Sequence, residues 1–595
     1  MKKQTRAGLA LGGASTLLLL FIGLGLAFIR ANSQTSDEAV HLTAGYSYLR
    51  TGDFRLNPEH PPFIKELCAL PVYLRYRLPF EPDSARWSQA EEWRIGRDFL
   101  YRSSVPGDGI LETGRVPNLI LGALLLALVG WWAYRLWGEW AALLAMAPAA
   151  LEPNLVAHAS LVTTDLGGAL FVFLALYLLW EYVARPTWLA LAGVGIATGL
   201  GLTSKYSVVL LVVMLLAVVG CHVLTGGSFP LPGRFGRGKK VKGGAGPRLV
   251  EAVAPVSLIL FISALVIPPV YFLQGFSTWW SGLQRVLGHQ ELGHFAFLLG
   301  DYSQDGWWYY FPVAFLIKTP VGSLLLILAS LVLLRAGRPL GKREAIFLML
   351  PVGILFAAAA TGRINIGLRH VLPVYPFLFV AASRLVTIRI RRSAMAPVLL
   401  AIPLVLTAWS ALRIAPHQLA YFNELIGGPG EGYRYLSDSN IDWGQDLRGV
   451  KAYMDREKLP AIYFSYFGNV PPEVYGIRYQ YVPAFGQLQR PTEEVLPPGM
   501  AREILAISVS NLQAVHFQDK NLFRWLYRRN PVEKIGYSIF VYDLTGDPEA
   551  HLRLAEVYLK AGPAGLAAPE LRKALALDPS NSDAKRLLDL ISQRP

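Results

Sequence analysis

Residues 8–29 read GLALGGASTLLLLFIGLGLAFI, a run without a single charged side chain between Arg6 and Arg30. About 20 apolar residues in a helix are enough to cross the roughly 30 Å hydrocarbon core of a bilayer. The run is long for the apolar core of a signal peptide, and no small-residue cleavage motif follows it. We therefore expect residues 8–29 to form a transmembrane helix that the mature protein retains.

The rest of the chain shares this apolar character. Of its 595 residues, 53% are hydrophobic and only 16% are charged, which is too apolar for an ordinary soluble protein. The pattern predicts a mainly α, polytopic membrane protein with about eleven transmembrane helices. Their apolar runs lie near residues 8–29, 115–134, 139–152, 166–184, 187–203, 206–224, 251–273, 311–334, 344–361, 371–387 and 394–413.

The net charge of +14 comes from basic residues in short loops rather than on one soluble face, so we interpret it as a topology signal and expect no nucleic acid partner. Lys and Arg favour the cytoplasmic side. With a cytoplasmic N-terminus, the first loop (residues 30–114) and everything after about residue 416 lie outside the cytoplasm. The basic inner loops would hold Arg135, Arg185, residues 233–248, Arg335, Arg338, Lys342, Arg343 and residues 389–393.

The chain changes character after the last apolar run, so residues 1–415 form a transmembrane module that includes the outer loop 30–114. Residues 416–545 contain short buried-strand patterns, AIYFSYFGNV (461–470) and EILAISVS (503–510), and predict a small extracytoplasmic α/β domain. Residues 546–595 resemble one tetratricopeptide repeat plus one further helix, and end in ALALDPSN (574–581) before that helix. A lone repeat cannot bury its own apolar face, so this tail must pack on the preceding domain or on a protein partner.

The first outer loop opens with SDEAVH (36–41). Thr35 and Glu38 have the spacing of a capping box, which alone can explain Glu38. Capping explains Asp37 less well, because Asp37 and His41 lie four residues apart on one helical face, where a carboxylate can orient an imidazole. We therefore expect Asp37 to have a chemical role.

Four motifs in order resemble the GT-C family of polyprenyl-phosphate-sugar-dependent glycosyltransferases, in particular bacterial relatives of protein O-mannosyltransferase and of the lipid A aminoarabinose transferase. They are the acidic pair with EHPPFIK (59–65), HASLVTTDLGGALF (158–171), GLTSKYSVVL (201–210) and GLRHVLPVYPFL (367–378), in which His370 stands where Tyr is common. The likeness covers roughly residues 5–415. It implies a GT-C fold in a bacterial plasma membrane and transfer of a sugar on the extracytoplasmic face.

The residue inventory suits that reaction. A phosphate leaving group needs no acid, unlike the alkoxide of a glycosidic bond, so the site needs one base and cations that hold the phosphate. We expect an inverting displacement with Asp37 as the base. The predicted catalytic residues are Asp37, Glu38 and Asp165, and the predicted substrate-binding residues are His41, His60, Lys65, Lys205, Arg363, Arg369 and His370.

Each assignment has a plainer alternative. Lys65 and Arg369 can extend towards lipid headgroups, as long basic side chains do at an interface. Asp165 begins an apolar helix, whose N-terminus favours a negative charge. Lys205 opens another apolar run and can lie near the interface for that reason alone.

No nucleotide-binding signature is present, which fits a sugar donor delivered on a polyprenyl phosphate to an acceptor protein, lipid or glycan. The reaction requires no cofactor. A divalent metal at His289, Glu291 and His294 is an alternative, although their spacing is not that of H-E-x-x-H. The segment SDSNIDWGQDL (437–447) does not fit an EF-hand loop and has no assigned role.

Two other classes of protein stay open. A transporter or flippase of lipid-linked material predicts ionisable residues near the middle of spans and broken helices in pairs. A non-catalytic membrane scaffold would use the tail to recruit partners. Turnover of a polyprenyl-phosphate sugar separates the enzyme from both.

Overall fold

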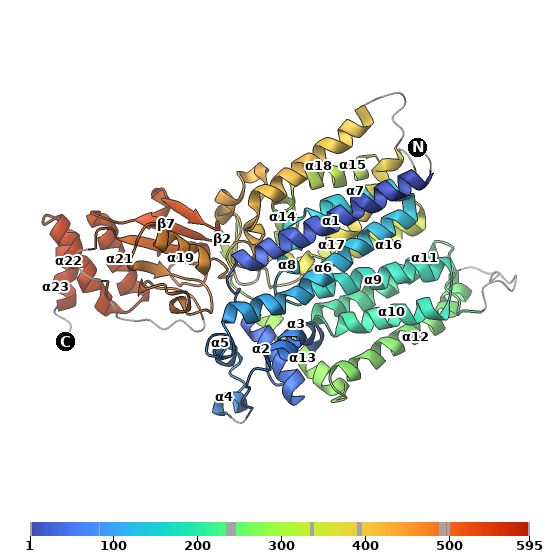
Figure 1. The fold of residues 1–595 in the computed structure, drawn as a ribbon, viewed down its shortest axis with the longest axis horizontal. Coiled ribbons are helices and arrows are strands. Elements are labelled where there is room, and N and C mark those ends of the chain that lie inside the picture. Colours follow the sequence, from blue (N-terminus) through green and yellow to red (C-terminus); the bar gives the residue numbers. More distant parts are fainter. Residues whose placement is uncertain are drawn as a thin grey trace.

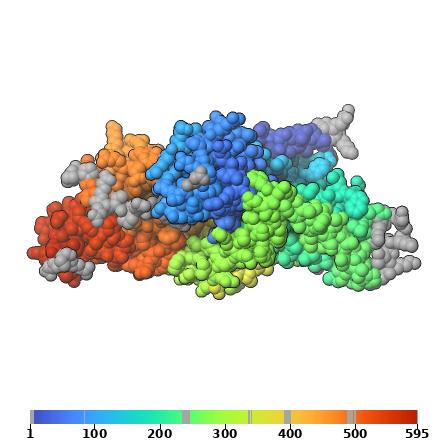
Figure 2. All heavy atoms as spheres, turned by 90° about the horizontal axis from the view of Figure 1, so that it is seen from below, coloured from blue at the N-terminus to red at the C-terminus, as the bar shows by residue number. Residues whose placement is uncertain are grey.

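The structure is a computed structural model that describes residues 3–82, 84–233, 245–333, 338, 340–388, 395–486, 495–496 and 500–592. A bundle of long helices carries a smaller α/β domain at one end, and the N-terminal end of α1 lies at the opposite end of the bundle (Figure 1). The space-filling view shows the first outer loop lying over the junction between the bundle and that domain (Figure 2).

Six helices of the described chain are long and apolar enough to cross a membrane. They are α1 (Lys3–Ala31), α6 (Gly107–Trp137), α9 (Asp165–Ala184), η1 (Tyr206–Val209) with α11 (Leu210–Leu224), α12 (Ala245–Val270) and α16 (Lys342–Ala360). Shorter apolar helices accompany them, namely α10 (Trp188–Leu202), α17 (Val374–Ser383) with η3 (Arg384–Thr387), and the second part of α18 (Met395–Ile414).

Two of the expected spans are sharply bent. The first pairs α7 (Glu139–Ala150) with α8 (Pro153–Ala159) at 70°, and the second pairs α14 (Tyr310–Lys318) with α15 (Val321–Val332) at 114°. The cause is local, because Glu152 and Thr319 each precede a proline and are extended, as that position favours. Residues 311–334 therefore do not form the straight span that the sequence suggested.

With both bent pairs counted, eight spans meet the length and composition of a membrane crossing in the described chain, so the expected number of eleven is not confirmed. Residues 234–244, 334–337 and 389–394, which carry much of the basic topology signal, lie outside the described residues. The orientation of the protein across the membrane stays a prediction.

Outside the apolar helices, short elements form the outer loops. The first loop contains α2 (Glu38–Thr51), α3 (Pro62–Tyr76), α4 (Ala85–Ser88) and α5 (Glu92–Tyr101). The loop after α12 contains α13 (Phe276–Leu292) and a hairpin of β1 (Ala296–Leu298) and β2 (Asp301–Ser303). The hydroxyl of Tyr302 in β2 donates to the carbonyl of Gln513 at 2.7 Å, which ties this loop to the C-terminal domain.

The C-terminal domain is built on a five-stranded mixed sheet in the order β4-β3-β5-β7-β6. Strand β3 pairs in parallel with β4 and β5, whereas β7 is antiparallel to β5 and β6. The strands are β3 (Ile462–Ser465), β4 (Tyr479–Tyr481), β5 (Ile504–Ser508), β6 (Glu533–Ile535) and β7 (Ile539–Asp543), and α19 (Leu447–Arg456) and α20 (Val509–Leu512) complete the domain. Ile462 and Phe464 of β3 belong to the same buried cluster as Leu447 and Val450 of α19, so α19 covers one face of the sheet.

The last three helices, α21 (Pro548–Ala561), α22 (Ala567–Leu577) and α23 (Ser582–Ser592), follow the sheet. On the face away from α19, the hydroxyl of Tyr463 in β3 donates to Glu570 of α22 at 3.0 Å. Glu570 also lies 2.7 Å from the Nδ1 atom of His551 in α21. The helices α21 and α22 thus pack on the preceding domain through buried polar contacts, while the tetratricopeptide character of the tail stays a prediction.

This contact predicts that the docking of the tail depends on pH. Burial acts to lower the pKa of His551, but hydrogen bonds and charges from Glu503 and Glu570 outweigh it and raise the pKa to about 9. A raised pKa stabilises the folded state fully below the ordinary value of about 6.5, and this stabilisation disappears as the pH rises through about 9. We expect hydrogen exchange in α21 and α22 to speed up between pH 8 and pH 10 relative to exchange in β5, after correction for the intrinsic rate. In His551→Gln this extra pH dependence should be absent, and an unchanged dependence in that variant would contradict the assignment.

Candidate active site

The site is built around a fully buried ion pair between Glu38 of α2 and Arg115 of α6, both of which have no exposed side-chain surface. Arg115 Nε and Nη2 donate to the two carboxylate oxygens of Glu38 at 2.8 and 2.6 Å. Its remaining N–H groups donate to the backbone carbonyls of Ile29, Asn32 and Ser33 at 3.1, 2.9 and 2.8 Å. All five donors of the guanidinium are therefore used within the protein.

The carboxylate of Glu38 is equally saturated. Besides Arg115, it accepts the backbone N–H of Thr35 and the backbone N–H of Val162, both at 2.9 Å. The bond from Thr35 is one half of the predicted capping box, and the Thr35 hydroxyl does not supply the other half, because it has no hydrogen-bond partner in the described chain. Glu38 retains no free oxygen for a substrate proton, so within the predicted catalytic group its part is to position Asp37 and the start of α2.

This pair fixes two short segments that carry the candidate catalytic carboxylates. Asp37 directly precedes Glu38 and sits at the N-cap of α2 without capping it through its side chain. Asp165 follows Val162 by three residues and begins α9. Because Glu38 binds both segments, the two aspartates are held at the same end of the bundle.

Arg369 bridges the two aspartates, and Lys205 pairs with one of them. Arg369 of η2 (Leu368–Val371) places Nη1 at 3.3 Å from Asp37 Oδ2 and at 3.6 Å from Asp165 Oδ2. Lys205 Nζ lies 2.5 Å from Asp165 Oδ1. The four side chains form an alternating series of Asp37, Arg369, Asp165 and Lys205, which we call the carboxylate–cation cluster.

The members of this cluster differ in access to solvent. The Asp37 side chain is 23% exposed, Lys205 is 15% exposed and Arg369 is 11% exposed, whereas Asp165 is only 2% exposed. Asp165 is thus a buried anchor for two cations, while Asp37 is the carboxylate that a ligand can reach.

Sequence reasoning missed Trp443, which comes from the C-terminal domain. The Cζ atom of Arg369 lies 4.3 Å from the centroid of the Trp443 ring, within the range of a cation–π interaction. The His158 ring also lies 6.3 Å from this ring. The segment that contains Trp443 had no assigned role in the sequence, and no single-sequence signal links it to Arg369.

Lys65 lies outside the carboxylate–cation cluster. Its ammonium donates to the Tyr48 hydroxyl and the Asn57 carbonyl, each at 2.8 Å, and to the Asn57 side chain at 3.4 Å. These contacts use its three N–H donors, so the structure gives no support to the prediction that it binds the lipid phosphate. Lys65 is also 1% exposed, which makes the headgroup interpretation wrong. Burial lowers the pKa of Lys65 to about 7, with Glu92 and Glu66 opposing the shift.

The three predicted histidines, His41, His60 and His370, lie around the carboxylate–cation cluster. His41 Nδ1 lies 2.9 Å from the carbonyl of Val162, and the His41 ring meets the His60 ring at 4.7 Å between centroids. Burial lowers the pKa of His41, and the charge of Asp37 opposes this shift only in part. His370 packs its ring 5.9 Å from that of Phe311.

Arg363 and the alternative metal ligands lie elsewhere. Arg363 is 55% exposed, contacts Asp305 at 3.7 Å and donates to the carbonyl of Glu291 at 3.0 Å, so it does not join the cluster as predicted. His289 contacts Glu59 at 3.5 Å, whereas His294 packs against His516. The described residues contain no group of three His, Cys, Asp or Glu side chains arranged to hold a metal ion.

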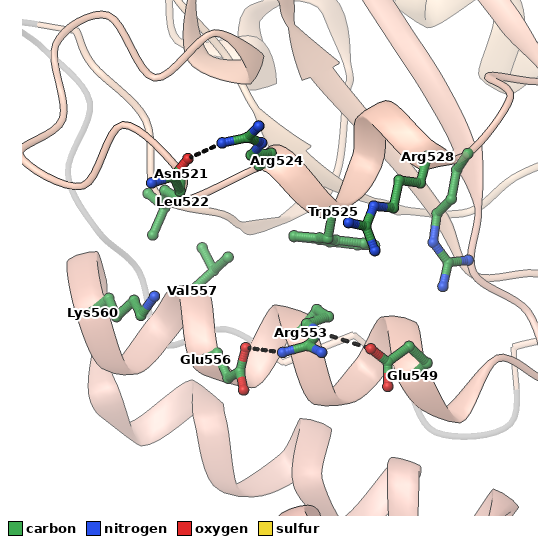
Figure 3. Close-up of a pocket in the computed structure, with 11 residues that line it drawn as sticks. Asn521, Leu522, Arg524, Trp525, Arg528, Glu549, Arg553, Glu556, Val557 and Lys560 are labelled. Carbon is green, nitrogen blue, oxygen red and sulfur yellow. Dashed lines mark hydrogen bonds and ion pairs between the residues drawn. The ribbon is translucent and has the colours of Figure 1, made fainter.

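An open pocket of about 650 Å³ lies far from this cluster, between η9 (Arg524–Arg528) and α21. Figure 3 shows Trp525 and Arg524 on one wall and Arg553 with Glu549 and Glu556 on the other. Most of its cations are paired within the protein, including Arg553 with both glutamates. The pocket contains none of the predicted site residues, so the carboxylate–cation cluster is the better candidate for chemistry.

The buried pair makes a direct prediction. In Glu38→Gln, the amide turns an N–H₂ group towards Arg115 or a backbone N–H, and the guanidinium loses its counter-charge. Breaking a buried pair from one side costs about 3–5 kcal/mol, and we expect a loss of that size in the free energy of unfolding in detergent. The control is Glu112→Gln on α6, the helix that carries Arg115; it removes the charge of a 38% exposed partner of Arg448 and should cost less than about 1 kcal/mol. Equal losses in the two variants would contradict the central position of Glu38.

The chain is similar to one protein family over part of its length and to two solved structures. Residues 107–227 match the family model of dolichyl-phosphate-mannose-protein mannosyltransferases, and no match was found among curated proteins. Crystal structures of ArnT from Cupriavidus metallidurans are similar at 12% sequence identity. The form bound to undecaprenyl phosphate has a TM-score of 0.48 and covers 91% of this chain and 98% of its own. The apo form has a TM-score of 0.47 and covers 90% and 98%. The family resemblance that the sequence motifs indicated is thereby confirmed by an independent family model over residues 107–227.

Proposed function

We propose that this protein is a membrane glycosyltransferase that moves a sugar from a polyprenyl-phosphate donor to an acceptor on the extracytoplasmic face. The observation that carries the proposal is the carboxylate–cation cluster, in which Arg369 bridges Asp37 and Asp165 and Lys205 pairs with Asp165. These groups gather at the ends of apolar helices, where the phosphate of a membrane-embedded carrier would meet water. The acceptor is a protein, a lipid or a glycan.

Asp37 is the base of the proposed reaction. The acceptor oxygen or nitrogen forms a bond to the anomeric carbon from the side opposite the phosphate, while its proton passes to Asp37. The bond between the anomeric carbon and the phosphate oxygen breaks, and the electron pair leaves with the lipid phosphate. One displacement of this kind inverts the anomeric centre, and it needs no cofactor.

Arg369 and Lys205 hold the leaving phosphate in this scheme. Both are cations with partly exposed side chains, and cations aimed at developing negative charge stabilise the transition state. Asp165 fixes the two cations, because it is almost fully buried and contacts each of them. It therefore acts as a positioning residue, and Glu38 has the same kind of role for Asp37.

The proposal predicts that replacing the base lowers the rate of sugar transfer while the protein still folds. In Asp37→Asn, the amide cannot take the acceptor proton, and general-base catalysis typically contributes about 10²–10⁴ in rate. We expect release of undecaprenyl phosphate from undecaprenyl-phosphate sugars to fall by that factor in reconstituted vesicles with a suitable acceptor. A panel of such donors, scored for loss of the intact donor, identifies the sugar.

The matched control is Asp53→Asn in the same outer loop, because the Asp53 side chain is 33% exposed and pairs only with Arg55 in the described contacts. It should leave release of the lipid phosphate unchanged. A flippase would move the donor across the vesicle and leave the sugar–phosphate bond intact. If no donor and acceptor pair yields lipid phosphate with the unmodified protein, the proposal fails.

A further inference from the structure

The C-terminal domain reaches into the carboxylate–cation cluster through residues 437–446, which we call the clamp segment. It contacts the chain just before Asp37, because the backbone N–H of Ser36 donates to the carbonyl of Trp443 at 2.9 Å. The backbone N–H of Ser33 likewise donates to the carbonyl of Gln445 at 2.8 Å. The clamp segment therefore holds the backbone that leads into Asp37.

The same segment holds the backbone on the other side of the site. The backbone N–H of Leu368 donates to Oδ1 of Asn440 at 3.0 Å, and the hydroxyl of Ser439 donates to the carbonyl of Ile366 at 2.7 Å. These bonds fix the residues that directly precede Arg369. One segment of the soluble domain thus binds both halves of the cluster, which are more than 300 residues apart in sequence.

Trp443 adds a contact to the Arg369 side chain itself. The indole is 3% exposed and belongs to a buried cluster with Phe28 and Leu419, so its position is fixed. An aromatic face attracts a cation but carries no net charge. It can therefore hold the guanidinium in place without adding a negative charge beside it.

Arg369 also has N–H donors that make no hydrogen bond within the described protein. Its hydrogen bond in the described structure is the one from Nη1 to Asp37, and its buried Nε has no hydrogen-bond partner. Arg115, in contrast, uses all five N–H groups on protein acceptors. A guanidinium that is held in place, partly exposed and not fully hydrogen-bonded is suited to bind a phosphate oxygen.

We propose that Trp443 is a positioning residue that holds Arg369 for the lipid phosphate, so that the extracytoplasmic domain forms one wall of the phosphate site. This inference rests on the proposed function, in which Arg369 binds the leaving phosphate. Without the Trp443 ring, the long Arg369 side chain can adopt rotamers that point away from the phosphate. Binding the phosphate then costs the conformational entropy of ordering this side chain, so the affinity falls.

The test measures binding of undecaprenyl phosphate to the purified full-length protein. Trp443→Leu removes the aromatic face but keeps an apolar side chain, and we expect the Kd to rise about tenfold. Trp443→Phe keeps an aromatic ring and should bind within about threefold of the unmodified protein. The control is Trp525→Leu in the same domain, which removes a comparable contact with Arg529 at 5.3 Å and should leave the Kd unchanged.

A double-mutant cycle separates positioning from general damage to the fold. Arg369→Gln alone should weaken binding, and adding Trp443→Leu to it should have no further effect, because the indole then has no cation to position. If Trp443→Leu fails to fold, Ser439→Ala is the second variant. It removes the hydrogen bond to the carbonyl of Ile366, loosens the backbone before Arg369 without changing the Trp443 ring, and should raise the Kd about threefold. Equal binding by Trp443→Leu and the unmodified protein, or additive effects in the cycle, would overturn the inference. Failure of the unmodified protein to bind undecaprenyl phosphate would instead overturn the proposed function.

Discussion

The structure of the candidate site depends on one interaction, the pair of Glu38 and Arg115. Two opposite charges with no exposed surface are tolerated in a protein interior only if every remaining donor and acceptor is also satisfied. That requirement determines the local chain path. Arg115 can complete its five hydrogen bonds only if residues 29–33 turn their carbonyls towards it, and Glu38 needs the N–H groups of Thr35 and Val162. The end of α1, the start of α2 and the loop before α9 are therefore fixed together, and Asp37 and Asp165 with them.

Arg115 and Arg369 illustrate how structural and chemical roles differ. Arg115 is saturated and has nothing left to offer a ligand, whereas Arg369 shares one nitrogen between two aspartates and rests on an uncharged ring. Saturation stabilises the fold, and incomplete saturation leaves capacity for binding. The same criterion separates Lys65, whose three donors are used on Tyr48 and Asn57, from Lys205, which contacts Asp165 and is partly exposed.

The sequence predicted the parts of this architecture that depend on local pattern. The apolar runs matched helices, the spacing of Thr35 and Glu38 predicted the bond from the Thr35 N–H to Glu38, and the motifs with Asp37, Asp165, Lys205 and Arg369 converge in space. It could not predict contacts set by tertiary folding, such as that of Glu38 with Arg115, 77 residues away, or that of Trp443 with Arg369. The contacts of Lys65 could not be predicted for the same reason, because the polar atoms that surround it come from the fold of its own loop rather than from a recognisable motif. The bend at Pro320 was missed because residues 311–334 are mostly apolar. In such a run, Pro320 is the local sign that the helix breaks.

The alternating charges of the cluster suit the proposed displacement in one further way. Before reaction, Arg369 is held by Asp37 and Asp165, so its charge is largely compensated. When the acceptor proton reaches Asp37, that carboxylate becomes neutral and its attraction for Arg369 falls. At the same moment the leaving phosphate gains negative charge and attracts the guanidinium more strongly. In the proposed reaction, proton transfer and departure of the phosphate would therefore favour each other through the single side chain of Arg369, which Trp443 and Asp165 would keep between the two partners.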